Sequence, residues 1–435
     1  YYLARTPGAQ PVAFAFGGEA QLVDYSRAMA DAALLALVAC LGLAQPSHEI
    51  TSYVTQLGCT ALLFFAAAAI AYHPYKAAAA MVFGLLGMSL SGAPTMSVMF
   101  GVATSLIVFT QRNWGATAGR VHQQARMWAG AWLIATIIGA ALTTALDRWS
   151  WHLVDSTKDS GELLQMLLWF CWPAWPLALW TVWVWRRQIA APTHYPHLSI
   201  ALLFALLPVI ACLSSLPADR ALLLGLPAIA TLAAFALPTF RRSISALIDW
   251  FTLLFFSGCA IVIWVIWVSM QTGVPKQPAA NVAKLAPGFE PSLSGLAFAA
   301  ALAGTLAWIW LVKWRVGRHR SAIWKSMVLP AGGATLCWLL LMTLWLPVLD
   351  YARSYAPMVQ RIQVLTSRPS CVQVHGMSRG QLAALRFHGK MNTVSAGRAA
   401  VCPWRLVAAA DVSSLPQDVD PGQWEFHSRV RRPTD

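Results

Sequence analysis

A turn between two apolar runs places an acid and an imidazole side by side. It reads Gln45-Pro46-Ser47-His48-Glu49-Ile50-Thr51 in this chain of 435 residues. A carboxylate beside an imidazole, in a partly dry junction between helices, can act as a base or hold a metal ion or a phosphate. Glu49 and His48 are therefore candidate catalytic residues, and a solvated turn or a helix N-cap is the alternative interpretation.

Two further turns offer groups that could bind a substrate. Ser91-Gly92-Ala93-Pro94 is a tight turn whose small residues let the backbone approach a ligand, unless it is a plain hairpin. Arg220 closes Ser214-Ser215-Leu216-Pro217-Ala218-Asp219-Arg220 and can hold a phosphate or diphosphate through bidentate charge-assisted bonds. A salt bridge to Asp219 or contact with ordinary lipid phosphate would explain Arg220 equally well. His152 is a further substrate-binding candidate, which could instead lie at the membrane interface.

The composition indicates which elements must position these turns. Apolar residues make up 58% of the chain and charged residues only 11%, against roughly a quarter charged in a soluble domain. With a mean hydropathy of +0.56, the chain is a helical membrane protein, and a soluble, disordered or collagen-like protein is excluded. The formal net charge of +14 would suggest nucleic acid in a soluble chain. No basic stripe with interleaved aromatic residues accompanies it, so we expect membrane lipids and no nucleic acid as partners.

Apolar windows of about 15 to 23 residues predict an all-α polytopic fold with about eleven transmembrane helices. The segment 6–30 is too polar to span and is expected to lie along one membrane face. The predicted spans are 31–46, 51–72, 77–91, 94–110, 127–146, 164–185, 197–216, 221–239, 250–271, 292–312 and 327–347.

The charges of the loops between these spans predict the orientation of the chain. Basic residues gather in alternate turns, which the positive-inside rule places in the cytoplasm. The opposite loops carry acids, and by the same parity the three candidate turns and everything after Leu349 face outside. The basic residues are Lys76, Arg112, Arg120, Arg126, Arg186, Arg187, Arg241, Arg242, Lys313, Arg315, Arg318, Arg320 and Lys325.

The chain changes character after the last predicted span. Residues 1–349 form the predicted transmembrane domain, whereas 350–435 hold no apolar run long enough to span and predict a small soluble domain. Alternation at 371–375 and at 424–430 predicts strands, and Ser378 followed by Gln381 predicts a capping box that opens a helix. The tail is therefore expected to be a small α/β unit.

Two of the eight cysteines lie in this polar tail, and the other six fall inside or at the ends of apolar segments. The six are typical of small buried hydrophobic residues. The spacing of Cys371 and Cys402 suits neither a zinc knuckle nor a redox CxxC motif. We therefore predict a disulfide between Cys371 and Cys402 in an oxidising compartment.

The order of the three turns, with the span Leu168-Trp169-Phe170-Cys171-Trp172-Pro173-Ala174-Trp175-Pro176-Leu177 between them, resembles a known family. It is similar to the membrane-embedded glycosyltransferases of the GT-C fold that use polyprenyl phosphate donors, in the branch of aminoarabinose transferase and protein O-mannosyltransferase. In that family an external turn ends in an acid, a later turn reads roughly Ser/Thr-Lys-Gly-Pro, and a basic residue precedes Leu-x-x-Pro-x-x-Ala. Glu49, the turn from Ser91 to Pro94, and Arg220 with Leu226-Pro227-Ala228 match these positions.

The resemblance implies transfer of a sugar from a polyprenyl-phosphate-linked donor to a lipid, glycan or protein acceptor. The reaction would take place at the periplasmic face of a bacterial inner membrane, with the C-terminal domain in the periplasm. Glu49, with His48 beside it, would shape the acceptor or a divalent cation site, and Arg220 would hold the donor phosphate.

The chain departs from the family in two places. The lysine of the second turn is Gly92 here, and the main catalytic carboxylate that follows the family's first span has no equivalent. Because Tyr1-Tyr2-Leu3-Ala4-Arg5 is typical of the end of a helix in progress, we expect a fragment that lacks upstream spans.

Two other functions fit the same apolar chain. A transporter or flippase for a lipid-linked glycan would predict internal pseudo-symmetry and polar groups at mid-membrane depth, which the sequence does not display. A non-enzymatic scaffold for the cell envelope would use the external tail to bind a partner.

Overall fold

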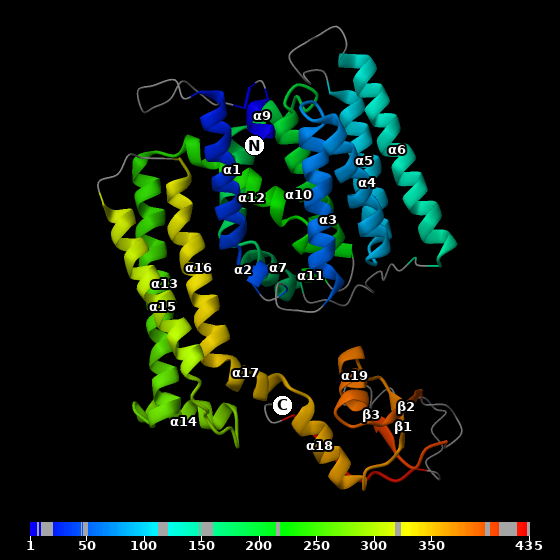
Figure 1. The fold of residues 1–435 in the computed structure, drawn as a ribbon, viewed down its shortest axis with the longest axis vertical. Coiled ribbons are helices and arrows are strands. Elements are labelled where there is room, and N and C mark those ends of the chain that lie inside the picture. The colour runs from blue at the N-terminus through cyan, green and yellow to red at the C-terminus, as the bar shows by residue number, and fades with distance from the viewer. Residues whose placement is uncertain are drawn as a thin grey trace. The chain divides into compact units, whose positions relative to one another are not determined.

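The computed structural model (Figure 1) is mostly helical and divides into two compact units. The first unit comprises Tyr1–Cys259 with Gly304–Trp338, and the second Ala260–Ala303 with Leu339–Asp435. The border predicted between residues 349 and 350 separates the transmembrane domain from the soluble tail, and it stays a prediction. The structure describes residues 1–6, 8–9, 21–44, 46, 51–111, 121–147, 149, 160–214, 218–317, 323–395, 401–408 and 424–432.

Helices make up nearly all of the described chain before residue 370. In chain order they are α1 (Leu22–Ala39), α2 (Leu41–Ala44), α3 (Ser52–Ala69), α4 (Pro74–Leu90), α5 (Pro94–Thr110), α6 (Val121–Ala145), α7 (Ser160–Phe170), α8 (Ala174–Val184), α9 (Arg186–Ile189), α10 (Pro196–Ser214), α11 (Ala218–Leu223), α12 (Leu226–Ala236), α13 (Arg242–Thr272), α14 (Lys276–Leu285), α15 (Gly295–Val316), α16 (Val328–Leu340), α17 (Leu346–Arg353) and α18 (Ala356–Leu365).

Several of these helices are suited to a membrane by length and composition. Within the described residues, six are long and apolar enough to cross, and a bent pair formed by α7 and α8 makes a seventh candidate. Three shorter apolar helices accompany them, at Pro74–Leu90, Pro94–Thr110 and Leu226–Thr239. The chain is therefore a polytopic, mostly α-helical membrane protein. The six long segments are Ser52–Ala69, Gln124–Ala145, Pro196–Leu213, Ser243–Thr272, Gly295–Val316 and Trp324–Leu365.

The first helix differs from the sequence prediction. We expected a polar surface segment over 6–30 and a span over 31–46, but α1 already begins at Leu22. Its buried residues include Tyr25, Met29, Ala32 and Ala36, which recur every three to four positions. The exposed charges occupy the opposite face, where Asp24 and Arg27 lie 3.9 Å apart. The helix thus starts nine residues before the predicted boundary at 31 and carries its charges on one face, while the location of 6–30 along a membrane face stays a prediction.

A second difference concerns the predicted span 164–185. The structure breaks it into α7 and α8, which are bent by 93° relative to each other. Pro173 lies in the break, and it has no backbone N–H to continue the helical hydrogen bonds. Two other prolines start helices instead, since Pro74 lies in the first turn of α4 and Pro94 in the first turn of α5.

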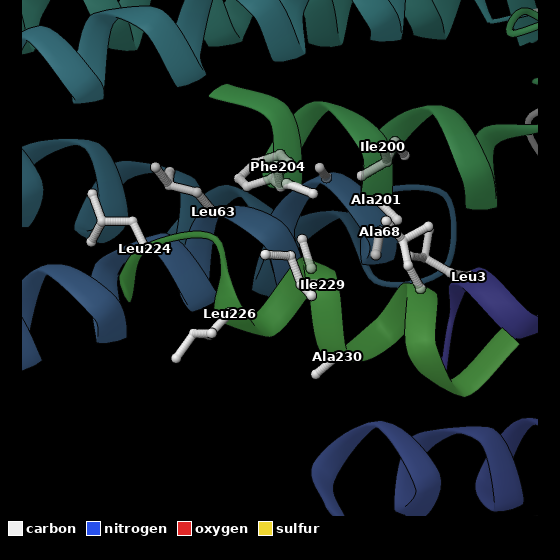
Figure 2. Packing of buried hydrophobic residues seen from close by; sticks show 14 of the residues in the cluster. Leu3, Leu63, Ala68, Ile200, Ala201, Phe204, Leu224, Leu226, Ile229 and Ala230 are labelled. Carbon is white, nitrogen blue, oxygen red and sulfur yellow. The ribbon is translucent and has the colours of Figure 1, made fainter. Parts of the chain in front are cut away.

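The core of the first unit forms where α3, α10 and α12 meet (Figure 2). Leu63, Phe204 and Ile229 project into it, and Phe204 also stacks on Phe100 of α5 with ring centroids 4.8 Å apart. In a membrane such contacts stabilise by close packing, since lipid is as apolar as leucine. Small residues permit that packing, because a Cβ at Gly101 would collide with the side chain of Thr136.

The tail of the second unit is a small α/β unit, as predicted. Strand β1 (Cys371–His375) pairs in parallel with β2 (Asn392–Ser395) and β3 (Arg405–Val407), in the order β2-β1-β3. Helix α19 (Arg379–Phe387) follows β1 and opens with the predicted capping box. The Ser378 Oγ accepts a hydrogen bond from the Gln381 backbone N–H at 3.3 Å, and the Gln381 side chain accepts one from the Ser378 N–H at 2.8 Å.

Cys371 and Cys402 form a disulfide whose Cα atoms lie 5.5 Å apart. It links the start of β1 to the segment before β3. The strand predicted at 424–430 is wrong, because these described residues form no strand. Trp424 instead lies beneath the Arg405 guanidinium, 4.6 Å from its ring centroid. Alternation alone does not make a strand, because a strand needs a neighbour to pair with, and none of the described strands pairs with these residues.

Candidate functional site

Short helices gather at one end of the first unit (Figure 1). Helix α11 contacts α2, α3, α7 and α10. The Leu41 N–H donates to the Trp172 carbonyl at 3.1 Å, which fixes the start of α2 to the break between α7 and α8. Gly42 packs so closely on the Phe170 ring that a Cβ has no room. This end of the unit is thus built from α2, α7, α11 and the first turns of α3.

The helix lengths explain why the chain turns at this end. Helix α8 has 11 residues and spans about 16 Å, well short of the roughly 30 Å hydrocarbon core. Helix α12, with 11 residues, packs against it. Helices α8 and α12 are therefore each, by themselves, shorter than the hydrocarbon core, and the short helices α7 and α11 precede them in the chain.

The turn that holds Ser91 and Gly92 joins α4 to α5 and is tied to α3. The Gln56 Nε2 donates to the Ser91 carbonyl at 2.9 Å, and the Gln56 side chain is buried. Gly92 adopts a φ of +100°, which side chains rarely accept. A Cβ added at Gly92 would have the Gln56 Nε2 as its nearest neighbour, at 3.9 Å. The glycine is therefore needed for the backbone conformation and not for space.

Gln56 is a site residue that the sequence prediction missed. It lies seven residues after Glu49 in the sequence, and it is the one amide side chain in the apolar segment Ser52–Ala69. A buried amide in a span must find a hydrogen-bond partner, because lipid offers none. That isolated amide was the available signal, and the structure shows that its partner is the second candidate turn.

The remaining predicted residues are placed only in part. Arg220 lies on α11, and its side chain is outside the described residues. His48, Glu49 and His152 also lie outside the described residues. Helix α11, which carries Arg220, contacts α3, and α3 in turn binds the Ser91–Gly92 turn through Gln56. Glu49 precedes α3 in the sequence.

The described residues contain no group of three or more His, Cys, Asp and Glu side chains that could hold a metal ion. The two residues expected at a divalent cation site, Glu49 and His48, are not among them.

A cavity of about 460 Å³ lies between α1, α3 and α12, away from these residues. Aromatic side chains line it, including Tyr2, Phe64 and Phe235. Its described lining includes none of the predicted site residues. Comparison of the chain with protein-family models, with curated proteins and with solved structures finds no match.

Proposed function

We propose that the chain is a membrane glycosyltransferase that moves a sugar from a polyprenyl phosphate to an acceptor on the outer face of a bacterial inner membrane. The proposal keeps the eleven predicted crossings. They are the six long helices, the bent pair, the three shorter apolar helices and α1. The alternating charge of the loops supports the orientation, with the tail from 350 in the periplasm.

One observation carries the proposal. Two of the three turns belong to elements that contact the same helix, since α11, which carries Arg220, packs on α3 and Gln56 of α3 binds Ser91. These are the turns that match the family pattern. A chain whose apolar helices merely filled a membrane would have no reason to join its small-residue turn and its arginine helix through α3, the helix that follows the acid turn in the sequence.

The proposed chemistry divides the work between these turns. Arg220 binds the phosphate that leaves with the polyprenyl chain, and its fixed fork of N–H groups suits two oxygens at once. The Ser91–Gly92 turn lets backbone approach the donor, with His152 as a further contact. Glu49, beside His48, orients the acceptor hydroxyl or amine and takes its proton as it attacks the sugar carbon that bears phosphate. The new bond forms with inversion while the bond from that carbon to the phosphate oxygen breaks, and polyprenyl phosphate leaves.

Glu49→Gln tests the proposal directly. The natural full-length protein is expressed in cells and its membranes are supplied with a polyprenyl-phosphate sugar labelled in the sugar. We expect the variant to lose most of the transfer of label, because the amide keeps the shape but not the charge of the acid. Glu290→Gln is the matched control, since Glu290 is exposed and lies on a different loop.

Transfer by Glu49→Gln within about twofold of the unchanged protein would remove Glu49 from the site. The unchanged protein could instead transfer sugar from none of the donors and yet move the intact lipid-linked sugar across the membrane. That result would favour the flippase alternative.

A further inference from the structure

One face of α8 carries an open groove of about 680 Å³. Trp175, Leu179 and Trp183 line it at intervals of four residues, and Arg186 follows three residues later at the start of α9. Trp183 is 65% exposed and Leu179 58% exposed. The groove is therefore an apolar strip that no described part of the chain covers and that ends at an arginine.

Arg186 is held in place by Trp183 at the end of α8. Its guanidinium carbon lies 4.8 Å from the centroid of the Trp183 ring, and its Nη1 donates to the Trp183 carbonyl at 2.8 Å. Both contacts fix the guanidinium at the end of the strip. Across the described parts of the chain it makes no salt bridge with a carboxylate, so its charge is balanced by none of them.

More positive charge lies near the same end. The Trp180 Nε1 donates to the Thr239 Oγ1 at 2.9 Å, and the Trp180 ring lies 5.7 Å from that of Phe240. Arg241 follows Phe240 directly, and both Arg241 and Arg187 are exposed. The wall of the groove is thus apolar from Trp175 to Trp183, over about 12 Å, and its end is cationic.

We propose that this groove binds an anionic phospholipid, with one acyl chain along Trp175, Leu179 and Trp183 and the phosphate on the Arg186 guanidinium. An apolar strip of this length fits a hydrocarbon chain, and a fixed guanidinium suits the two free oxygens of a phosphodiester. The site is separate from the proposed transfer site, because α7 and α11 lie at the opposite end of α8 from Arg186. Its existence does not depend on the transferase activity.

The test compares two lipids that share chains and differ in headgroup charge. The purified full chain, stripped of lipid in detergent, is titrated with phosphatidylglycerol and with phosphatidylcholine, and bound lipid is counted by native mass spectrometry. We expect phosphatidylglycerol to bind about tenfold more tightly, as a charge-assisted hydrogen bond allows. Arg186→Gln should remove that preference, whereas Arg126→Gln, which changes an exposed arginine on α6, should keep it.

Equal affinity of the unchanged protein for the two lipids would overturn the proposal, as would a preference that survives Arg186→Gln. Glycerol 3-phosphate is titrated in the same way, because it carries the phosphate of the headgroup but no acyl chain. If glycerol 3-phosphate bound as tightly as phosphatidylglycerol, the apolar wall would contribute nothing to affinity, and the proposal would also be overturned.

Trp183→Leu provides a second variant should Arg186→Gln fold poorly. It keeps the strip apolar but removes the ring that holds the guanidinium, so the preference for phosphatidylglycerol should fall about threefold or more. An unchanged preference in Trp183→Leu would contradict the proposed arrangement.

Discussion

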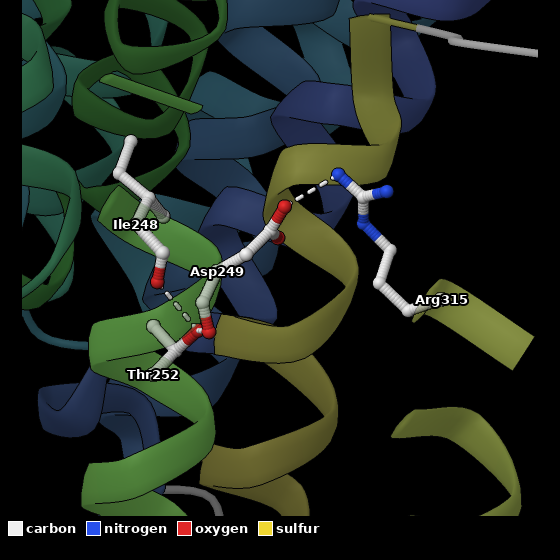
Figure 3. A network of polar contacts seen from close by, with 4 residues as sticks. All are labelled: Ile248, Asp249, Thr252 and Arg315. Atoms are coloured by element: carbon white, nitrogen blue, oxygen red, sulfur yellow. Dashed lines mark hydrogen bonds and ion pairs between the residues drawn. The ribbon is translucent and has the colours of Figure 1, made fainter. Parts of the chain in front are cut away.

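The Arg315 Nη2 donates to the Asp249 Oδ2 at 2.6 Å and thereby joins α15 to α13 (Figure 3). Both side chains are largely buried, at 24% and 20% exposure. The second carboxylate oxygen, Oδ1, has no hydrogen-bond partner among the described residues. Charged groups in membrane helices are costly unless they are paired, so this contact holds the end of α15 in register with the first turns of α13.

The pair gives a first prediction about stability. Asp249→Asn should destabilise the protein by about 3 kcal/mol, because it leaves the Arg315 charge without a partner. The effect is measured by heating the protein in detergent and determining the folded fraction at each temperature by size-exclusion chromatography. The double variant Asp249→Leu with Arg315→Leu should be more stable than either single change. Additive losses would show that the two side chains do not depend on each other.

Arg220 gives a second prediction, on donor affinity. Arg220→Ala should weaken binding of polyprenyl phosphate by about tenfold or more, since a charge-assisted contact is lost. Binding is measured on the purified chain, with Arg126→Ala on α6 as the matched loss of one arginine. Unchanged affinity in Arg220→Ala would place the phosphate elsewhere, and an effect confined to acceptor dependence would do the same.

Gly92 gives a third prediction that separates conformation from space. Gly92→Ala should destabilise by roughly 1–2 kcal/mol, because its φ of +100° is unfavourable for a side chain while the nearest atom to a Cβ is 3.9 Å away. The melting temperature should fall accordingly.

Gly130→Ala is the control for that substitution. Gly130 lies inside α6, and no atom lies within 4 Å of where its Cβ would be. Alanine there should be neutral or stabilising by up to about 1 kcal/mol, because it favours helix. A loss of stability at Gly130 equal to that at Gly92 would reject the conformational explanation.

The disulfide gives a fourth prediction. Its cysteines are separated by 31 residues, and closing a loop of that size stabilises the folded tail by about 3–4 kcal/mol. Cys371→Ser with Cys402→Ser should therefore make the tail sensitive to limited proteolysis, whereas Cys259→Ala on α13 should not. Reaction of both Cys371 and Cys402 with maleimide in the unreduced protein would refute the bond in the cell-derived material.

Local signals in the sequence predicted the local elements well. The spans expected at 51–72 and 94–110 correspond to α3 and α5, and the Ser378 capping box is where the pattern places it. Apolar length, a proline in the first turn and a capping pair are all properties of neighbouring residues. They can be read without knowing the fold.

Features that depend on distant residues could not be predicted in this way. Asp249 and Arg315 are 66 positions apart, and each by itself is typical of a loop charge. The partner of Gln56 is 35 positions away, so its role in positioning the Ser91 turn was invisible. For the candidate site, the turns could be predicted from the sequence, whereas the contact of the Arg220 helix, α11, with α3 could not.

The shortness of α8 has a consequence for the membrane itself. A helix of 11 residues leaves roughly half of the bilayer thickness unmatched. Lipids around such a mismatch thin locally, and headgroups and water are drawn inward on the side where the helix stops. In the proposed orientation that is the outer side, beside α7 and α11. A phosphate carried on a long lipid would then meet water below the average surface of the bilayer, and its hydrocarbon chain would stay dissolved in lipid throughout.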